Sequence, residues 1–304
     1  MKIGIIGTGS MGRNHMRVVD SIPELELTGA SDISVENLKE ASAGYNIKTF
    51  SSHEELLDLV DAVMVSTPTT HHYQIAKYFI EKGKDVLVEK PFTSTLNQAD
   101  ELIELANRKG VKIAVGHLER FNPAVEYIQK YIQEPLFIEV QRLGSFSPRS
   151  LDVDVINDLM IHDLDIILQW DKSGIAKINS SGIPVISKKV DIANSRIEFN
   201  SGLVANITAS RISQKKTRKL RIFQKNGYFS VDYKKKRVKI YRINGAEVIE
   251  DIPEIEDIEP LFNLWNNFYK TIKTGKNYNV TGKDGRNALE LAEKVSYSIK
   301  NIEV

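Results

Sequence analysis

Short apolar runs alternate with amphipathic segments along the first part of the chain. The runs are rich in β-branched residues, as in buried parallel strands, and the segments between them repeat apolar residues at helical spacing. Strands are predicted at residues 3–6, 25–30, 48–50, 62–66, 85–88 and 112–116. Helices are predicted at 11–21, 35–43, 51–59, 71–82 and 96–109. This order predicts a doubly wound parallel sheet with right-handed crossovers, the Rossmann arrangement.

The pattern changes near residue 122, where the second domain is predicted to begin. Further helices are predicted at 124–133, 153–169, 260–274 and 282–301. Strands are predicted at 137–146, 178–187, 192–199, 203–210, 220–225, 228–233, 238–243 and 248–252. Their alternation predicts an open, largely antiparallel sheet with helices on one face. We therefore expect a dinucleotide-binding domain at 1–121 and an α+β substrate-binding and oligomerisation domain at 122–304, whose last helix is a candidate to pack back on the first domain.

Composition narrows the class of protein. The chain has 304 residues, 41% of them hydrophobic and 27% charged, with a net charge of +1. There is therefore no electrostatic case for nucleic acid, and the basic runs 215–221 and 234–237 are expected on solvated strand edges. The absence of cysteine excludes disulfides, thiolate metal sites and cysteine nucleophiles. With no signal-peptide pattern and no membrane-length apolar run, a cytoplasmic location is expected.

A glycine motif joins the first strand to the first helix. Gly7, Gly9 and Gly12 form G-x-G-x-x-G, in which the glycines permit the tight turn, the approach of backbone to a pyrophosphate and close packing of helix on strand. Asp32 follows the second strand, where a carboxylate accepts hydrogen bonds from the adenosine ribose. This carboxylate favours NAD over NADP, although Arg13 lies close to the turn.

Further cofactor contacts are expected where the strands end, because ligands of such sheets bind outside the carboxyl ends of the strands. The expected cofactor-binding residues are, besides these glycines and Asp32, Thr8, Ser10, Met11, Ser66, Thr67, Pro68, His71, Glu89, Lys90 and His117.

Several motifs together resemble one family. They are the glycine turn, Thr-Pro-x-x-His at 67–71, Glu-Lys-Pro at 89–91, Asp-x-x-x-His at 158–162 and Gly-Lys-Asp-Gly-Arg-Asn-Ala-Leu-Glu at 282–290. Over essentially its whole length, the chain resembles the Gfo/Idh/MocA family of NAD(P)-dependent oxidoreductases. The resemblance implies a Rossmann domain paired with an open-sheet domain, Lys90 as the catalytic lysine, and Asp158 with His162 as its partners.

Residues 116–124 and 158–165 resemble most the branch of the family that oxidises UDP-N-acetylglucosamine at C3. Relatives that act on inositol, free sugars or other sugar nucleotides share much of this pattern. The expected substrate is therefore a sugar or a sugar nucleotide. A catalytically silent NAD sensor on the same fold is the alternative from another class, and intact Lys90, Asp158 and His162 argue against it.

Oxidation of a secondary alcohol requires a hydride acceptor, a base and positive charge near the developing alkoxide. Asp158 and His162 lie at i and i+4 on a predicted helix, so they share a face. We expect His162 to be the general base, because the ordinary pKa of histidine lies near neutral pH. Lys90 is expected to hydrogen-bond the reacting hydroxyl, with a cis peptide before Pro91 as one way to aim it, and Asp158 to orient the imidazole or tune the lysine.

Each of these residues also has an ordinary structural explanation that needs no catalytic role. A lysine before proline is often a solvated loop charge, and a histidine on an amphipathic helix is often an interface or cap residue. Asp163 is expected to face solvent or to pair locally, and Asp165 is left open.

Arg120, Asn122 and Arg149 are expected to hold a polar or anionic substrate, along with Lys90, Asp158 and His162. The alternative for Arg149 is an exposed loop arginine. His15 is expected to pack or to contact the cofactor, and His53 to begin a helix. The six histidines lack the spacing of metal ligands, so no metal is predicted. A homodimer or homotetramer is expected from the open sheet.

Overall fold

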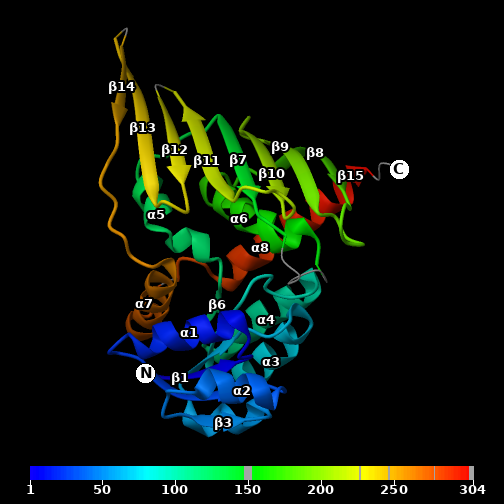
Figure 1. Cartoon of the computed structure of the whole chain (residues 1–304), viewed down its shortest axis with the longest axis vertical. Coiled ribbons are helices and arrows are strands. Elements are labelled where there is room, and N and C mark those ends of the chain that lie inside the picture. Colours follow the sequence, from blue (N-terminus) through cyan, green and yellow to red (C-terminus); the bar gives the residue numbers. More distant parts are fainter. Residues whose placement is uncertain (147–152, 226, 246, 277, 301–304) are drawn as a thin grey trace. The chain divides into compact units, whose positions relative to one another are not determined.

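The computed structural model describes residues 1–146, 153–225, 227–245, 247–276 and 278–300 (Figure 1). The chain folds as two compact units. The first comprises Met1–Leu118 with Glu259–Arg286, and the second comprises Glu119–Ile258 with Asn287–Val304. None of the helices in these described ranges combines the length and apolar character that a membrane crossing needs.

The first unit contains a parallel sheet of six strands in the order β3-β2-β1-β4-β5-β6. The strands are β1 (Lys2–Ile6), β2 (Glu26–Ser31), β3 (Lys48–Phe50), β4 (Ala62–Val65), β5 (Asp85–Val88) and β6 (Ile113–Val115). The helices are α1 (Ser10–Asp20), α2 (Val35–Ser42), α3 (Thr69–Glu81), α4 (Leu96–Lys109) and α7 (Pro260–Thr274). Helix α1 packs beside α7, and α3 packs beside α4. The predicted doubly wound sheet is confirmed.

Capping explains where helices of this unit begin and end. The Thr95 hydroxyl accepts a hydrogen bond from the Gln98 N–H at 3.3 Å, and α4 ends at Gly110 in the left-handed region. The α-helix predicted at 51–59 is wrong, because a 3₁₀ helix, η1 (His53–Leu59), lies there. The hydroxyl of Ser52 contacts the Glu54 carboxylate and caps no backbone group.

The second unit contains a sheet of nine strands in the order β14-β13-β12-β11-β7-β10-β9-β8-β15. The strands are β7 (Phe137–Leu143), β8 (Ile175–Ile183), β9 (Ile192–Phe199), β10 (Val204–Ser210), β11 (Thr217–Gln224), β12 (Gly227–Asp232), β13 (Arg237–Asn244), β14 (Glu247–Asp251) and β15 (Ile299–Lys300). Only the pairs β7–β10 and β8–β15 are parallel among these described strands. The predicted largely antiparallel sheet is confirmed.

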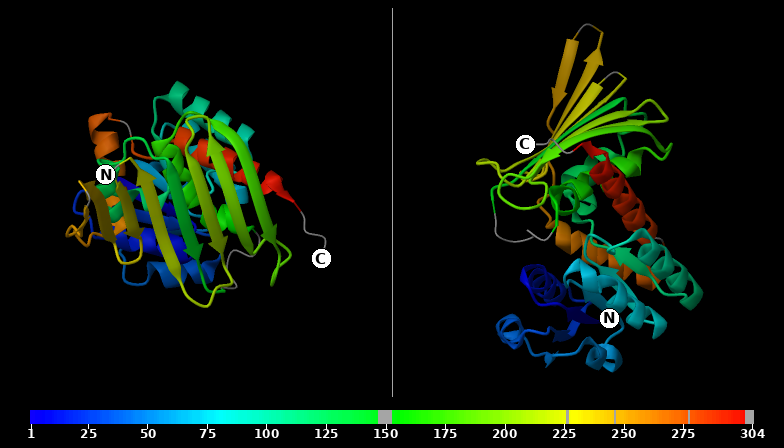
Figure 2. Two further views of the ribbon diagram at one scale, coloured as in Figure 1. Left: turned by 90° about the horizontal axis from the view of Figure 1, so that it is seen from above. Right: turned by 90° about the vertical axis from the view of Figure 1, so that its right-hand side faces the viewer.

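Helices cover one face of this sheet and leave the other uncovered (Figure 2). They are α5 (Pro123–Gln129), α6 (Ile161–Trp170) and the later part of α8 (Gly282–Ser298), whose first residues belong to the first unit. Alternation on β7 follows this division, since Ile138 and Val140 are buried and Gln141 is exposed. The basic run was expected on strand edges, but β11 lies inside the sheet, and Arg221 pairs there with Glu139 of β7 at 2.9 Å. Lys219 and Arg221 are exposed on the open face, whereas Arg218 lies on the other face, 3.7 Å from Glu119.

The helix predicted at 153–169 is interrupted. A π-helical turn, η3 (Ile156–Met160), precedes α6 and carries Asp158. The 3₁₀ turn η2 (Leu118–Phe121) follows β6, and Lys90 and Pro91 are joined by a cis peptide bond. π-helical turns like η3 occur frequently at functional sites.

Candidate active site

The glycine turn of the first unit is held by close backbone contacts. Gly7 has a φ of +87°, and a Cβ there would lie 2.8 Å from the Ser66 carbonyl. A Cβ on Gly12 would lie 1.9 Å from the Gly7 oxygen, so helix and turn could not approach as they do. A Cβ on Gly9, by contrast, would meet no atom within 4 Å. Gly7 and Gly12 therefore build the turn, and Gly9 leaves open space over it.

Asp32 is fixed beside this turn. Its Oδ2 accepts hydrogen bonds from the backbone N–H of Thr8 at 2.7 Å and from the Thr8 hydroxyl at 3.0 Å. Its Oδ1 accepts from the Ser34 N–H at 2.9 Å. Thr8 is buried, and its backbone and hydroxyl both support the Asp32 carboxylate.

A cavity of about 530 Å³ opens at the same place. Seven of the expected cofactor residues line it: Gly7, Gly9, Asp32, Ser66, Thr67, Pro68 and His71. Helix α1 begins beside it at Ser10, and its N-cap, Gly9, supplies no capping side chain. A helix N-terminus, an open glycine cradle and a fixed carboxylate fit the phosphates and ribose of a dinucleotide.

Sequence reasoning missed part of the cavity wall. Ile33, Ser34 and Asn37 follow β2, and Ser51 and His53 follow β3. Ile33 is 93% exposed, an unusual position for a large apolar side chain, and it faces this cavity. The available signal was positional, since these residues follow the carboxyl ends of β2 and β3, the two strands on one side of β1.

His71 and His72 occupy different environments. His71 lines the cavity, whereas His72 is buried. The ring nitrogens of His72 lie 2.8 Å from the Thr67 carbonyl oxygen and 2.9 Å from that of Pro91. Burial disfavours the charged ring and lowers the pKa of His72, although the two carbonyl groups act in the opposite direction. His72 therefore ties the turn after β4 to the turn after β5.

The other expected residues of this unit lie after β5, after β6 or at the start of α1. Glu89 is buried and lies 3.0 Å from the ring of His15, which supports the packing role for that histidine. Lys90 is half-buried, and His117 is buried directly after β6. Ser10 and Met11 lie in the first turn of α1. None of these residues belongs to the cavity wall as described.

Asp158 and His162 belong to the second unit. Both are half-buried, and they lie one turn apart where η3 passes into α6. Lys90 belongs to the first unit, so a single site formed by all three residues stays a prediction.

A buried charge network follows His162 on α6. The Asp163 carboxylate accepts hydrogen bonds from Arg142 at 2.5 and 2.8 Å, and Glu119 accepts from Arg142 at 2.8 Å. The Tyr233 hydroxyl donates to Asp163 at 3.2 Å. Burial opposes the charge on Arg142, but the two carboxylates outweigh it and raise the pKa of the guanidinium. Asp163 therefore neither faces solvent nor pairs locally, because its partner comes from β7.

Arg120 and Asn122 also have partners inside the second unit. The Nε and Nη2 of Arg120 donate to the two carboxylate oxygens of Asp165, each at 2.7 Å, and both side chains are buried. Asn122 caps α5 by accepting from the Ala124 N–H, and its amide donates to the Tyr233 carbonyl. These contacts give both residues structural roles, and their substrate roles stay predictions. Arg149 lies outside the described residues.

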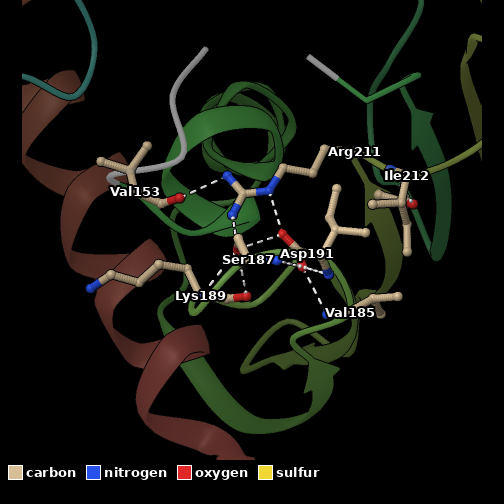
Figure 3. Close-up of polar contacts among 9 residues, drawn as sticks. Val153, Val185, Ser187, Lys189, Asp191, Arg211 and Ile212 are labelled. Atoms are coloured by element: carbon tan, nitrogen blue, oxygen red, sulfur yellow. Dashed lines mark hydrogen bonds and ion pairs between the residues drawn. The ribbon is translucent and has the colours of Figure 1, made fainter. Parts of the chain in front are cut away.

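A second buried cluster supports the start of the η3–α6 segment (Figure 3). Oδ2 of Asp191 accepts from three backbone N–H groups, those of residues 185–187. Its Oδ1 accepts from Arg211, whose Nη1 donates to the Val153 carbonyl at 2.8 Å. Burial opposes ionisation, but these N–H groups and the Ser187 hydroxyl hold the pKa of Asp191 well below its ordinary value.

No group of three or more histidine, aspartate or glutamate side chains that could hold a metal ion occurs among the described residues.

Comparison with known proteins places this geometry in context. Residues 1–117 match the Gfo/Idh/MocA family, described as an oxidoreductase family with an NAD-binding Rossmann fold. The UDP-N-acetylglucosamine 3-dehydrogenase of Acidithiobacillus ferrooxidans is 38% identical over 258 residues, which cover 84% of this chain and 82% of that protein.

Two further likenesses extend over nearly the whole chain. A solved structure of the same Acidithiobacillus ferrooxidans enzyme matches with a TM-score of 0.93 and 34% identity, covering 98% of this chain and 97% of that one. The myo-inositol 2-dehydrogenase of Thermotoga maritima is 24% identical over 99% of this chain and 96% of its own length. The chain is therefore an oxidoreductase that belongs to the Gfo/Idh/MocA family of NAD-binding enzymes.

Proposed function

We propose that the protein is an NAD-dependent dehydrogenase that oxidises a secondary hydroxyl of a sugar nucleotide, with UDP-N-acetylglucosamine at C3 as the best-supported substrate. The observation that carries this proposal is the likeness to a UDP-N-acetylglucosamine 3-dehydrogenase over 98% of the chain, at 34% identity. This likeness extends over both units of the chain.

Three residues carry the proposed reaction. Lys90 follows the carboxyl end of β5, the end of the sheet at which the glycine turn also lies. Asp158 and His162 lie one turn apart at the junction of η3 and α6. We propose that the two units bring these residues to one substrate.

NAD supplies the hydride acceptor when it is bound. His162 takes the proton of the reacting hydroxyl, and Lys90 donates a hydrogen bond to the oxygen on which negative charge develops. Asp158 orients the imidazole. The substrate loses one proton to His162 and one hydride from carbon, which leaves a ketone.

The environment of Asp32 supports NAD over NADP. Three donors fix its carboxylate at the wall of the cavity, where it would accept from ribose hydroxyls and repel a 2′-phosphate. Arg13, the residue that argued for NADP, is paired with Glu40 at 2.7 Å. We therefore expect Asp32→Ala to lower the ratio of kcat/KM with NAD to kcat/KM with NADP.

Self-association as a homodimer or homotetramer is part of the proposal. The uncovered sheet face carries a row of stacked aromatic side chains, in which Phe223, Tyr228 and Tyr241 lie 5.1 and 4.3 Å apart between successive ring centres. Such a face is suited to bind a second copy. Light scattering coupled to gel filtration tests this, and a monomer at micromolar concentration would contradict it.

The reaction is tested by the absorbance of NADH with UDP-N-acetylglucosamine as substrate. We expect Lys90→Met and His162→Ala each to lower kcat by roughly 10³-fold. Lys109→Met, at an exposed lysine that ends α4, is the matched control and should retain activity. Normal turnover by both site variants would refute the proposed roles.

A second candidate substrate is an inositol. The likeness to a myo-inositol 2-dehydrogenase over nearly the full length favours it, at lower identity. A higher kcat/KM with myo-inositol than with UDP-N-acetylglucosamine in the same assay would select this alternative.

A further inference from the structure

A buried chain of hydrogen bonds in the first unit ends at the proposed catalytic lysine. The indole Nε1–H of Trp265 on α7 donates to Nδ1 of His15 on α1 at 3.0 Å. Nε2 of His15 lies 3.0 Å from Oε1 of Glu89, and Oε2 of Glu89 accepts from the backbone N–H of Lys90 at 3.1 Å. His15 and Trp265 are fully buried, and Glu89 is 8% exposed. The reaction proposed above uses none of these three side chains.

The indole determines the tautomer of His15. An indole nitrogen can only donate, so Nδ1 of His15 must be the acceptor and carries no proton. The proton of the neutral ring is then on Nε2, which donates to Glu89. If Nδ1 of His15 also carried a proton, its N–H would face the indole N–H of Trp265. This arrangement therefore fixes both the tautomer and the orientation of the imidazole.

Space and charge around Glu89 favour its carboxylate form. A Cβ on Gly116 would lie 3.1 Å from Oε1, so the glycine leaves room for the group. The charged or titratable groups that face Glu89 are His15, Lys90, His72 and Tyr278. Burial opposes ionisation, but the hydrogen bond from His15 and the positive charge of Lys90 hold the pKa of Glu89 below its ordinary value.

The peptide of Lys90 is held on its other side as well. The carbonyl of Pro91, the next residue, lies 2.9 Å from the ring of His72. Elements from three parts of the chain, α1, α3 and α7, therefore converge on the turn that carries Lys90. Buried charges stabilise a fold poorly compared with apolar side chains, so retaining an ionised glutamate here suggests a role in the reaction.

We propose that Glu89 is the positioning residue of Lys90, and that Trp265 and His15 fix the Glu89 carboxylate by imposing one histidine tautomer. This inference rests on the proposed function of Lys90. The carboxylate accepts the hydrogen bond from the Lys90 backbone N–H, and by holding this peptide it aims the Lys90 side chain at the reacting oxygen.

Steady-state kinetics with NAD and UDP-N-acetylglucosamine test the positioning role. We expect Glu89→Gln, which preserves size and removes the charge, to lower kcat by about 100-fold, as expected for a misplaced catalytic group. Glu89 was expected from the sequence to contact the cofactor, but it is not part of the cavity wall. The dissociation constant of NAD and the substrate KM should therefore change by less than about threefold. Glu89→Asp should recover part of kcat. An unchanged kcat in Glu89→Gln would overturn the proposal.

Trp265→Phe tests whether the indole fixes the tautomer of His15. It also tests the proposal independently of whether the Glu89 variants fold. It retains an aromatic ring but removes the donor, so we expect kcat to fall by about fivefold. Trp170→Phe is the matched control, since its indole N–H has no hydrogen-bond partner among the described residues. It should retain the wild-type kcat.

Nuclear magnetic resonance of the protein without substrate separates this inference from the proposed function. In wild type we expect a His15 ring protonated at Nε2 and bare at Nδ1, and in Trp265→Phe a mixture of tautomers. The Lys90 amide proton should shift in Glu89→Gln. If these spectra are observed but no sugar is turned over, the proposed function is refuted and the hydrogen bonds from Trp265 to Lys90 stand. If the Lys90 amide does not shift and the tautomer does not change, this series of hydrogen bonds is refuted.

Discussion

The cavity of the first unit and the surroundings of His162 in the second unit place polar groups in opposite ways. In the first unit the cavity wall depends on backbone geometry, because Gly7 and Gly12 shape the turn and the N–H groups of Thr8 and Ser34 hold the Asp32 carboxylate. In the second unit the polar groups near His162 are buried ion pairs, such as Arg142 with Asp163. A site built from backbone follows from local sequence spacing, whereas a site built from buried charges depends on partners far apart in the chain.

The largest expected effect comes from the buried charges of the second unit. Arg142→Met leaves two carboxylates, Asp163 and Glu119, buried without their cation, and we expect it to lower the free energy of unfolding by about 4 kcal/mol at neutral pH. Arg221→Met removes the same residue type from a half-exposed pair with Glu139 in the same sheet, and should cost less than about 0.5 kcal/mol. Urea unfolding of both variants measures the contrast, and equal effects would contradict it.

Asp191→Asn should have the next largest effect, about 3 kcal/mol at neutral pH, because it breaks a buried pair with Arg211. The pKa of Asp191 is lowered in the folded state, so its contribution is complete above the ordinary aspartate pKa and is lost as the pH falls below it. The difference between wild type and variant should therefore shrink between about pH 5 and pH 2. A difference that stays constant over this range would refute the assignment.

Backbone crowding in the first unit gives a smaller effect on stability. A methyl group on Gly12 would meet the Gly7 oxygen, so Gly12→Ala should cost about 2 kcal/mol and weaken NAD binding. Gly9→Ala enters open space and should leave the free energy of unfolding within about 0.5 kcal/mol of wild type. Its affinity for NAD should still fall, by about tenfold, because the methyl group occupies the approach to the turn. Calorimetry measures the free energy of unfolding and the NAD affinity of both variants. An unchanged NAD affinity in Gly9→Ala would show that the cofactor does not bind at the glycine turn.

The smallest effect expected is a pH dependence of the first unit. The pKa of His72 is lowered on folding, so below the ordinary histidine pKa of about 6.5 the unfolded chain binds a proton that the folded protein does not. Stability should therefore fall as the pH drops from about 7 to about 5.5. His72→Gln should lose this part of the dependence. Wild type and variant with parallel pH profiles would show that His72 is not responsible.

This contrast also explains what the sequence could predict. The parallel sheet, the glycine turn and the position of Asp32 depend on spacing within about thirty residues, and periodicity reveals such patterns. The ion pair of Arg142 with Asp163 joins a strand to a helix 21 positions away, and that of Arg120 with Asp165 joins residues 45 apart, and neither pair belongs to a motif of fixed spacing. No local pattern indicates which carboxylate a given arginine will meet.

The same limit applies to the surroundings of Lys90. Its Glu-Lys-Pro motif is visible in the sequence, but His15 lies 74 positions from Glu89, and Trp265 lies 250 positions from His15. The π turn that carries Asp158 also escaped prediction, because the apolar spacing there is that of an ordinary helix.

We propose that Lys90 of the first unit and His162 of the second act on one sugar hydroxyl. The most direct measurement is NADH formation from NAD and UDP-N-acetylglucosamine by wild type, Lys90→Met and His162→Ala. We expect turnover by wild type and a loss of roughly 10³-fold in each variant. Turnover that survives in both variants would contradict it.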